Sequence, residues 1–285
     1  MNKTRHLLIN ILSQTRIPAL ARKLLERNGR FVLMFHGVYK KKYPDLPDTV
    51  QRYFSVDEFS SALDWLKIRF SFLTTKDFLN SNKPGVLLTF DDGFANNASN
   101  ALPVLEKFYA PAVFFVTTQH VMDPQNWLPA TSEMVSSFWR SPGDVPASIA
   151  ADLFNGMSES DLKKCAQHPL ITIGSHTISH PYLTKCTFQQ VSDELISSRD
   201  YLEAVTGRNV DLLAYPSGDY DRHVAETAKR VGYVAAFAVN CNKVGIPNFE
   251  IPRIGLFQAD PAYLDLKLSG LFRVPIKPDS NIHHV

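Results

Sequence analysis

The chain has 285 residues, of which 45% are hydrophobic and 20% are charged. This composition is typical of a soluble globular protein, and the length suits one large α/β domain or two small ones. The formal net charge is only +2, and no basic stripe interleaved with aromatic residues occurs, so we expect no nucleic-acid partner. No run reaches the roughly 18–20 apolar residues that a membrane-spanning helix needs.

Basic residues gather at the beginning of the chain, where residues 1–30 hold seven lysines and arginines against the single acidic Glu26. Leucines and isoleucines recur there at roughly helical spacing. One interpretation is a helix lying on an anionic membrane surface, which would make the protein peripheral to the inner membrane. The other is an ordinary amphipathic helix packed on the domain, with its basic face in water. Asn10 and Arg16 interrupt the apolar run and no cleavage site follows, so we expect no signal peptide.

The cysteines bear on the cellular compartment. Cys165, Cys186 and Cys241 are odd in number and show no C-x-x-C spacing. They are typical of reduced thiols rather than of a disulfide framework, which favours a cytoplasmic location.

Short apolar runs bounded by turn residues predict a series of strands. They lie at 31–35, 86–90, 112–116, 171–173, 210–215, 234–239 and 251–256. Helices are predicted between them at 55–69, 98–108, 187–206 and 222–231, two of which begin with capping boxes, Ser55 to Glu58 and Thr187 to Gln190. Residues of about 120–165 lack a strand pattern and are interpreted as helices and loops inserted into the scaffold.

This alternation indicates an α/β protein built from parallel β-α units, with the site beyond the carboxyl ends of the strands. Polar residues follow four of the strands directly, so we expect them to meet at one end of one sheet or barrel. The domain is expected to span 31–270, between the basic segment 1–30 and a C-terminal tail 271–285.

Two of these polar clusters suggest a metal site. In Thr89–Gly93, the neighbouring carboxylates Asp91 and Asp92 end a strand and point in opposite directions, so one can bind a metal while the other acts as a base. In Ser175–His180, two histidines four residues apart can converge on one ion. A turn and an isolated surface histidine are the plainer interpretations. Together with Asp92, however, His176 and His180 form a His₂-carboxylate set with open coordination positions, typical of a hydrolytic centre.

The two clusters resemble the first two signature motifs of carbohydrate esterase family 4, the polysaccharide deacetylases related to nodulation-factor deacetylase. Their order and separation fit, and the likeness extends over most of residues 31–257. The resemblance implies a deformed, often incomplete (β/α) barrel. It also implies that Asp91 is the catalytic base and that Asp92, His176 and His180 bind the metal.

The third motif of the family, normally Arg-x-Pro-x-Gly, departs from its pattern in Ala214–Gly218. Ala214 stands where the arginine that steadies the base is expected, and Ser217 replaces an aromatic residue. A backbone N–H near Ser217 remains available for an oxyanion. Arg253, which follows a late strand, is our candidate for the missing guanidinium, and a surface salt bridge is its alternative interpretation.

The family's last motif, Leu-x-His, is missing near the C-terminus, where His283 and His284 lie in a polar tail. The equivalent pattern occurs at the front, in Val32–His36. This arrangement resembles the circularly permuted branch that includes biofilm and exopolysaccharide deacetylases. His36 is therefore our candidate for the general acid, and a buried structural histidine is the weaker alternative.

The implied reaction is hydrolysis of an N-acetyl group on an N-acetylated polysaccharide or oligosaccharide by a metal-activated water, with Asp91 as base and His36 as acid. The alternatives are O-deacetylation of a glycan, deformylation of a lipid-linked amino sugar, and a catalytically inactive carbohydrate-binding module. Zinc suits the ligand set best, although cobalt, nickel and iron also bind such sites. Trp127, Tyr215 and Phe94 are candidates for stacking on sugar rings.

Overall fold

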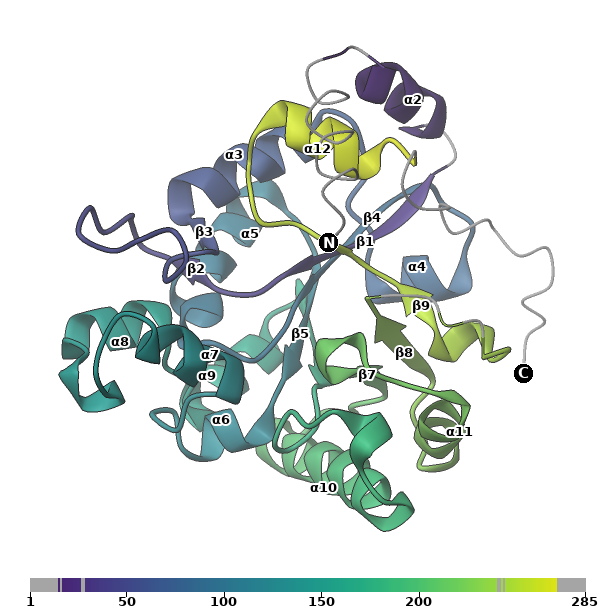
Figure 1. The fold of residues 1–285 in the computed structure, drawn as a ribbon. Helices are drawn as coiled ribbons and strands as arrows, with labels where there is room; N and C mark the ends of the chain where they lie inside the picture. Colours follow the sequence, from purple (N-terminus) through teal and green to yellow (C-terminus); the bar gives the residue numbers. More distant parts are fainter. Residues whose placement is uncertain (1–14, 16, 27–28, 240–241, 243, 271–285) are drawn as a thin grey trace.

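The computed structural model describes residues 15, 17–26, 29–239, 242 and 244–270. Its centre is an eight-stranded sheet in which every pair of neighbouring strands is parallel. Figure 1 shows the strands of this sheet in the middle of the molecule and the helices arranged around them. In sheet order the strands are β10 (Ile254–Gly255), β1 (Arg30–Phe35), β4 (Gly85–Phe90), β5 (Ala112–Val116), β6 (Ile171–Ser175), β7 (Leu212–Ala214), β8 (Ala235–Ala238) and β9 (Ile251–Pro252).

The two edges of the sheet meet around a single residue. β9 pairs with β8 at one edge and β10 pairs with β1 at the other, yet only Arg253 separates β9 from β10 in sequence. The backbone N–H of Arg253 donates to the carbonyl of Ala238, at 2.8 Å. The predicted strand at 251–256 is therefore two short strands that nearly close the sheet into a barrel. This confirms the (β/α) barrel expected from the sequence.

Four of the helices that cover the barrel lie where the sequence predicts them, at 55–69, 98–108, 187–206 and 222–231, whereas those at 75–80 and 261–268 were not predicted. The capping boxes of Ser55 with Glu58 and of Thr187 with Gln190 are both formed, and each satisfies amide groups that the first helical turn leaves unpaired. The covering helices are α3 (Val56–Lys67), α4 (Thr75–Asn80), the π-helix η1 (Asn97–Ala101) that continues into α5 (Leu102–Phe108), α9 (Glu159–Gln167), α10 (Phe188–Thr206), α11 (Arg222–Arg230) and α12 (Pro261–Leu268).

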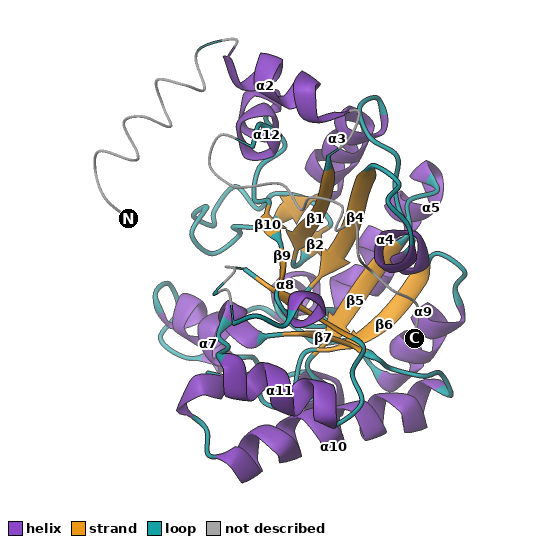
Figure 2. Ribbon diagram, turned by 90° about the vertical axis from the view of Figure 1, so that its right-hand side faces the viewer, coloured by secondary structure: helices purple, strands orange, loops and turns teal. Residues whose placement is uncertain are grey.

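The expected insertion of helices and loops follows β5. It contains α6 (Thr118–Met122), α7 (Pro129–Ser136) and α8 (Ala147–Leu153), and Figure 2 shows α7 on the opposite side of the strands from α4 and α5. Helices α7 and α8 share an apolar cluster with the segment that contains β2 (Val38–Tyr39) and β3 (Phe54–Ser55). The insertion therefore packs on the loops at one end of the barrel rather than on its helical wall.

The basic N-terminal segment is described only in part. Helix α2 (Ile17–Glu26) lies against α12, where buried Arg22 forms an ion pair with Asp265 and its guanidinium lies 5.2 Å from the ring of Trp65. The described part of the segment is thus packed on the domain. Arg22 faces inward, however, whereas the interpretation as a packed amphipathic helix placed the basic face in water. Residues 1–14 and the tail 271–285 lie outside the described residues. Within the described ranges, no helix has both the length and the apolar character needed to span a bilayer.

Candidate active site

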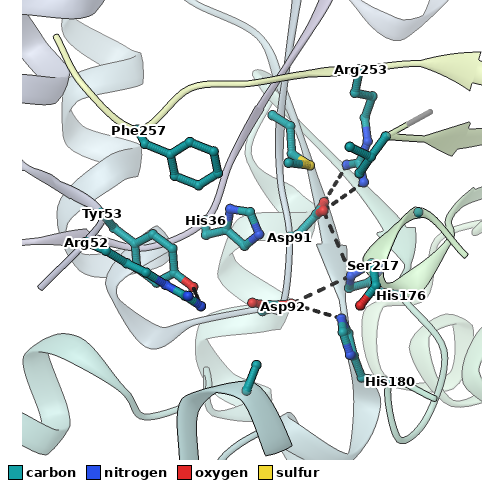
Figure 3. A pocket seen from close by; sticks show the side chains of 14 residues that line it. His36, Arg52, Tyr53, Asp91, Asp92, His176, His180, Ser217, Arg253 and Phe257 are labelled. Carbon is teal, nitrogen blue, oxygen red and sulfur yellow. Dashed lines mark hydrogen bonds and ion pairs between the residues drawn. The ribbon is translucent and has the colours of Figure 1, made fainter. Parts of the chain in front are cut away.

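A pocket opens at the carboxyl ends of the barrel strands (Figure 3). Most of its polar lining comes from the loops that follow β1, β4, β6, β7 and β9, because parallel strands of a barrel end at the same rim. The lining side chains are Met34, His36, Arg52, Tyr53, Asp91, Asp92, Ala130, His176, His180, Ser217, Gly218, Val239, Arg253 and Phe257.

The two neighbouring aspartates differ in their main partners, although Nε2 of His176 lies near both, 3.9 Å from Oδ2 of Asp91 and 3.6 Å from Oδ1 of Asp92. Asp91 is buried and faces Arg253, whereas the carboxylate of Asp92 faces the two histidines. Asp92 has a φ of 76°, a left-handed conformation that is uncommon for a residue with a side chain. The buried His120 lies behind it, with Nδ1 3.2 Å from the Asp92 carbonyl oxygen and Nε2 3.1 Å from that of Phe154. This contact ties the end of β4 to the end of α8.

The residues predicted to bind a metal come together. Nε2 of His176 lies 3.6 Å from Oδ1 of Asp92, and Nε2 of His180 lies 3.7 Å from the same oxygen. One potential ligand atom from each of the three residues lies within 4.8 Å of the other two. Nδ1 of His176 is 2.8 Å from the carbonyl oxygen of Ala214. If it donates there, as metal-binding histidines commonly do to a backbone carbonyl, the lone pair of Nε2 is directed at Asp92.

The loop that carries both histidines is held in a strained shape. Thr177 and His180 have φ values of 67° and 58°. The carboxylate of Glu194, on α10, accepts hydrogen bonds from the backbone N–H groups of Ile178 at 2.8 Å and Ser179 at 3.1 Å. Backbone strain of this kind persists only where surrounding contacts impose it, and it is frequent at functional sites.

Asp91 is bound by Arg253 through two parallel hydrogen bonds. Nη1 donates to Oδ1 at 2.6 Å and Nη2 donates to Oδ2 at 2.8 Å, and both side chains are buried. Burial alone would raise the pKa of Asp91, but the charges of Arg253 and His176 and the hydrogen bonds from Arg253 together outweigh burial and lower the pKa to about 2. Ala214, at the family's usual arginine position, ends β7 and has no charge to offer. The guanidinium instead enters from the seam between β9 and β10.

His36 lies at the end of β1, between two aromatic rings. Its ring is 5.1 Å from that of Tyr53, nearly parallel at 5°, and 6.0 Å from that of Phe257. Burial lowers its pKa, while the charges of Asp92 and Asp91 oppose that change. Its buried Nδ1 has no hydrogen-bond partner among the described residues. An unpaired buried imidazole nitrogen at a pocket is an observation that points to a ligand.

The aromatic residues suggested for sugar stacking do not face the pocket. Tyr215 is fully buried: its ring stacks on Tyr220 at 4.7 Å, and its hydroxyl donates to the Phe249 carbonyl oxygen at 3.0 Å. Phe94 is likewise buried. Trp127 is half-buried against Phe154 and donates through Nε1 to Asn155, outside the lining. The structure therefore places none of these three rings in the pocket.

Other lining residues gave no signal in the sequence. Arg52 and Tyr53 follow a loop without apolar periodicity, and Phe257 follows the short β10. Phe257 remains 41% exposed in contact with His36, so it is an aromatic surface that a sugar can reach. Ser217, the predicted neighbour of an oxyanion, does line the pocket, and its φ of 55° is left-handed.

Comparisons with known proteins agree with this geometry. The family model described as polysaccharide deacetylase matches residues 79–236, more than half of the chain. The Bacillus subtilis protein YxkH is 25% identical over 210 residues, covering 71% of this chain and 61% of its own length. A poly-β-1,6-N-acetyl-D-glucosamine N-deacetylase of Staphylococcus epidermidis is 27% identical over 256 residues, covering 80% and 79%. The chain thus spans less than two thirds of YxkH.

The fold is also similar to solved structures. IcaB from Ammonifex degensii superimposes with a TM-score of 0.63 at 22% sequence identity, over 85% of this chain and 96% of that one. The barrel and the paired carboxylates at its rim define a class of α/β-barrel proteins with a candidate hydrolytic centre. The chain belongs to the polysaccharide deacetylase family, and its relatives include proteins named poly-β-1,6-N-acetyl-D-glucosamine N-deacetylase.

Proposed function

We propose that the protein is a metal-dependent hydrolase that removes N-acetyl groups from an N-acetylated glycan. One observation carries this proposal: a cluster of possible metal ligands, Asp92 with His176 and His180, lies beside a second carboxylate, Asp91, that Arg253 holds in place. The name of the related S. epidermidis protein, a poly-β-1,6-N-acetyl-D-glucosamine N-deacetylase, supports N-acetylated sugar as the substrate class.

The three clustered residues fit a divalent metal ion. Two imidazoles and one carboxylate leave coordination positions open, which is the arrangement of catalytic rather than structural sites. Zinc suits this donor set, and cobalt, nickel and iron are the other candidates. When bound, such an ion would supply a Lewis acid for the acyl carbonyl and lower the pKa of water at the site.

The protein's own groups then move the protons. Asp91 accepts the proton of the attacking water. Its pKa of about 2 keeps the carboxylate ionised at neutral pH. Arg253 fixes the direction of both carboxylate oxygens. His36 donates a proton to the leaving amine nitrogen, which is a poor leaving group unless protonated. A lowered pKa makes the imidazolium a stronger acid, although a smaller fraction of His36 is charged at neutral pH. A backbone N–H near Ser217 is the proposed partner of the oxyanion.

Acetate release from short N-acetylglucosamine oligomers tests the proposal. Protein stripped of metal should release no acetate, reloading with zinc or cobalt should restore release, and Asp91→Asn should abolish it. Asp45→Asn, at an exposed position, is the matched control and should keep activity. Stoichiometric metal binding without acetate release would instead favour another acyl group, as in O-deacetylation or deformylation of a lipid-linked amino sugar. A carbohydrate-binding module without turnover would also fit that result.

We also propose a peripheral membrane contact through residues 1–30. Two apolar side chains on the described helix α2 support it, Ile17 with 53% and Leu20 with 65% of their surface exposed, next to the exposed Lys23. Sedimentation with anionic vesicles should fall when both apolar residues are changed to serine. Unchanged sedimentation would contradict the contact. A cytoplasmic location remains a proposal as well, supported by the free thiols of Cys165 and Cys186 and testable by cell fractionation.

A further inference from the structure

Arg52 places a positive charge at the rim of the pocket. Its exposed guanidinium lies 5.2 Å from the ring of Tyr53, and Nη2 donates to the Tyr53 hydroxyl at 3.1 Å. The Tyr53 ring in turn stacks on His36. Figure 3 shows the guanidinium beside that hydroxyl, on the side of the pocket where Asp92 lies. An aromatic stack therefore connects Arg52 to the proposed proton donor.

The loop that carries Arg52 is fixed by its own polar contacts. The buried Gln51 exchanges two hydrogen bonds with the backbone of Tyr43, at 2.9 and 2.8 Å, and donates to the Leu46 carbonyl oxygen at 2.6 Å. The Tyr39 hydroxyl donates to the Gln51 carbonyl oxygen at 3.3 Å. A buried amide with this many partners holds the backbone of the next residue in place. These hydrogen bonds therefore fix the position of the Arg52 backbone at the rim of the pocket.

The guanidinium of Arg52 forms no ion pair with a carboxylate among the described residues. Lys42, on the same loop, pairs with Asp48 and Glu58. Within the pocket, Arg253 already offsets the charge of Asp91. A guanidinium offers five N–H donors in a planar fork that matches a carboxylate or a phosphate. One of these donors is occupied by the Tyr53 hydroxyl.

We propose that Arg52 is a specificity-determining residue that binds an anionic group of the substrate. The glycan would carry a carboxylate or a phosphate close to the acylated sugar, within reach of the rim while the acyl group lies between Asp91 and His36. This inference rests on the proposed function and narrows its substrate class from N-acetylated glycans in general to anionic ones. With a neutral glycan, the remaining N–H donors of the Arg52 guanidinium would form hydrogen bonds only with water.

Three matched trisaccharides of N-acetylglucosamine test the inference: one neutral, one with a carboxylate and one with a phosphate on a neighbouring sugar. With the full-length, zinc-loaded protein, KM for a charged trisaccharide should be about tenfold lower than for the neutral one, as expected for a charge-assisted hydrogen bond. Arg52→Gln should remove that preference, and Arg52→Lys should keep part of it. Lys42→Gln is the control on the same loop and should keep the preference. Added salt should weaken the preference.

The outcomes separate this inference from the proposed function. Equal KM values for all three trisaccharides, or an equal effect of Arg52→Gln on each, would overturn the role of Arg52 while leaving deacetylation intact. If no acetate appears from any of them, the proposed function fails, and calorimetry of the same glycans on the zinc-loaded protein still decides the inference. Tighter binding of the charged glycans that Arg52→Gln removes would support it, and equal binding would overturn it. The carboxylate and phosphate arms identify the anion.

Discussion

Arg253 and Asp91 form a buried bidentate pair across the barrel, with N–O distances of 2.6 and 2.8 Å. The arginine lies at the one residue that joins the two edge strands of the sheet. The aspartate directly follows β4, the third of the eight strands in sheet order. Arg253 thus joins the two edges of the barrel and also fixes the orientation of Asp91, the proposed base. This relationship explains how the site tolerates Ala214 at the family's usual arginine position.

Replacing Arg253 should damage both stability and activity. Arg253→Gln leaves the carboxylate of Asp91 buried without a cationic partner, so we expect a loss of about 3–5 kcal/mol in the free energy of unfolding. The pKa of Asp91 should rise, because the charge and hydrogen bonds of Arg253 no longer oppose the effect of burial. Loss of a correctly held base should lower kcat by about 100-fold or more. Urea unfolding and acetate release measure the two effects.

The control for this change is an exposed arginine. Arg222 pairs with Glu226 at 2.8 Å on the surface of α11, and Arg222→Gln should change the free energy of unfolding by less than about 1 kcal/mol. Arg253→Lys should be intermediate in both measurements, since an ammonium keeps the charge but not the planar fork. Wild-type kcat in Arg253→Gln would show that Asp91 needs no positioning.

Local patterns in the sequence predicted the parallel β-α units and the meeting of the central groups of the site, whereas the barrel itself was implied by the family resemblance. Apolar runs mark buried parallel strands, and capping boxes mark helix starts, as Ser55 and Thr187 do. His176 and Asp92 could be placed near one another since parallel strands end at the same rim. These predictions required only the order of elements, which short-range patterns carry.

The rest of the site depends on contacts distant in sequence. Whether Tyr215 faces the pocket or the core depends on Tyr220 and Phe249, and nothing in its own strand distinguishes the two. Arg52 reaches the rim only because Gln51 anchors an irregular loop. The partner of Arg253 could be suggested but not established, because the closure of the barrel is a tertiary property.

Metal binding should depend on the histidine cluster. We expect His180→Asn to weaken zinc binding strongly, because it removes one of three proposed ligands. At a zinc concentration 100 times Kd, binding should stabilise the wild-type protein by about 2.7 kcal/mol, and the variant should lose this gain. Thermal unfolding with and without zinc measures it. His168→Asn, at a histidine that pairs with Glu106 far from the cluster, is the control. Equal zinc stabilisation of both variants would refute the assignment.

Gly156 should tolerate no side chain. A Cβ atom there would lie 1.8 Å from the carbonyl oxygen of His120 and 2.7 Å from its ring, the ring that also contacts the Asp92 carbonyl. Gly156→Ala must therefore displace the backbone behind the proposed metal ligand, and we expect a loss of about 2–4 kcal/mol together with weaker zinc binding. At Gly143 the nearest atom to an added Cβ is 3.7 Å away, so Gly143→Ala should be nearly neutral. Similar unfolding curves for the two variants would contradict this prediction.

Acid should destabilise the metal-free protein in two separate pH ranges. Burial lowers the pKa of His176 to about 4 and also lowers those of His36 and His120, so the folded state keeps these rings neutral. The unfolded chain protonates histidines below about pH 6.5. The contribution of neutral His176 to stability is therefore full above that pH and is lost as the pH falls toward 4, by up to about 1.4 kcal/mol per pH unit, and His36 and His120 act in the same direction.

Protonation of Asp91 causes the loss of stability in the lower of the two pH ranges. Its folded pKa of about 2 lies below the unfolded value near 3.9, so its contribution is present above pH 3.9 and is lost as the pH falls toward 2. Urea unfolding between pH 8 and pH 3 in the presence of a chelator should therefore show a decline that begins near pH 6.5, well before the carboxylates titrate. His176→Gln should make the decline between pH 6.5 and 4 shallower, because one neutral imidazole is removed. Stability that stays constant from pH 7 to pH 4.5 would mean that these rings are charged in the folded protein, and that the pocket does not hold His176 ready to bind a metal.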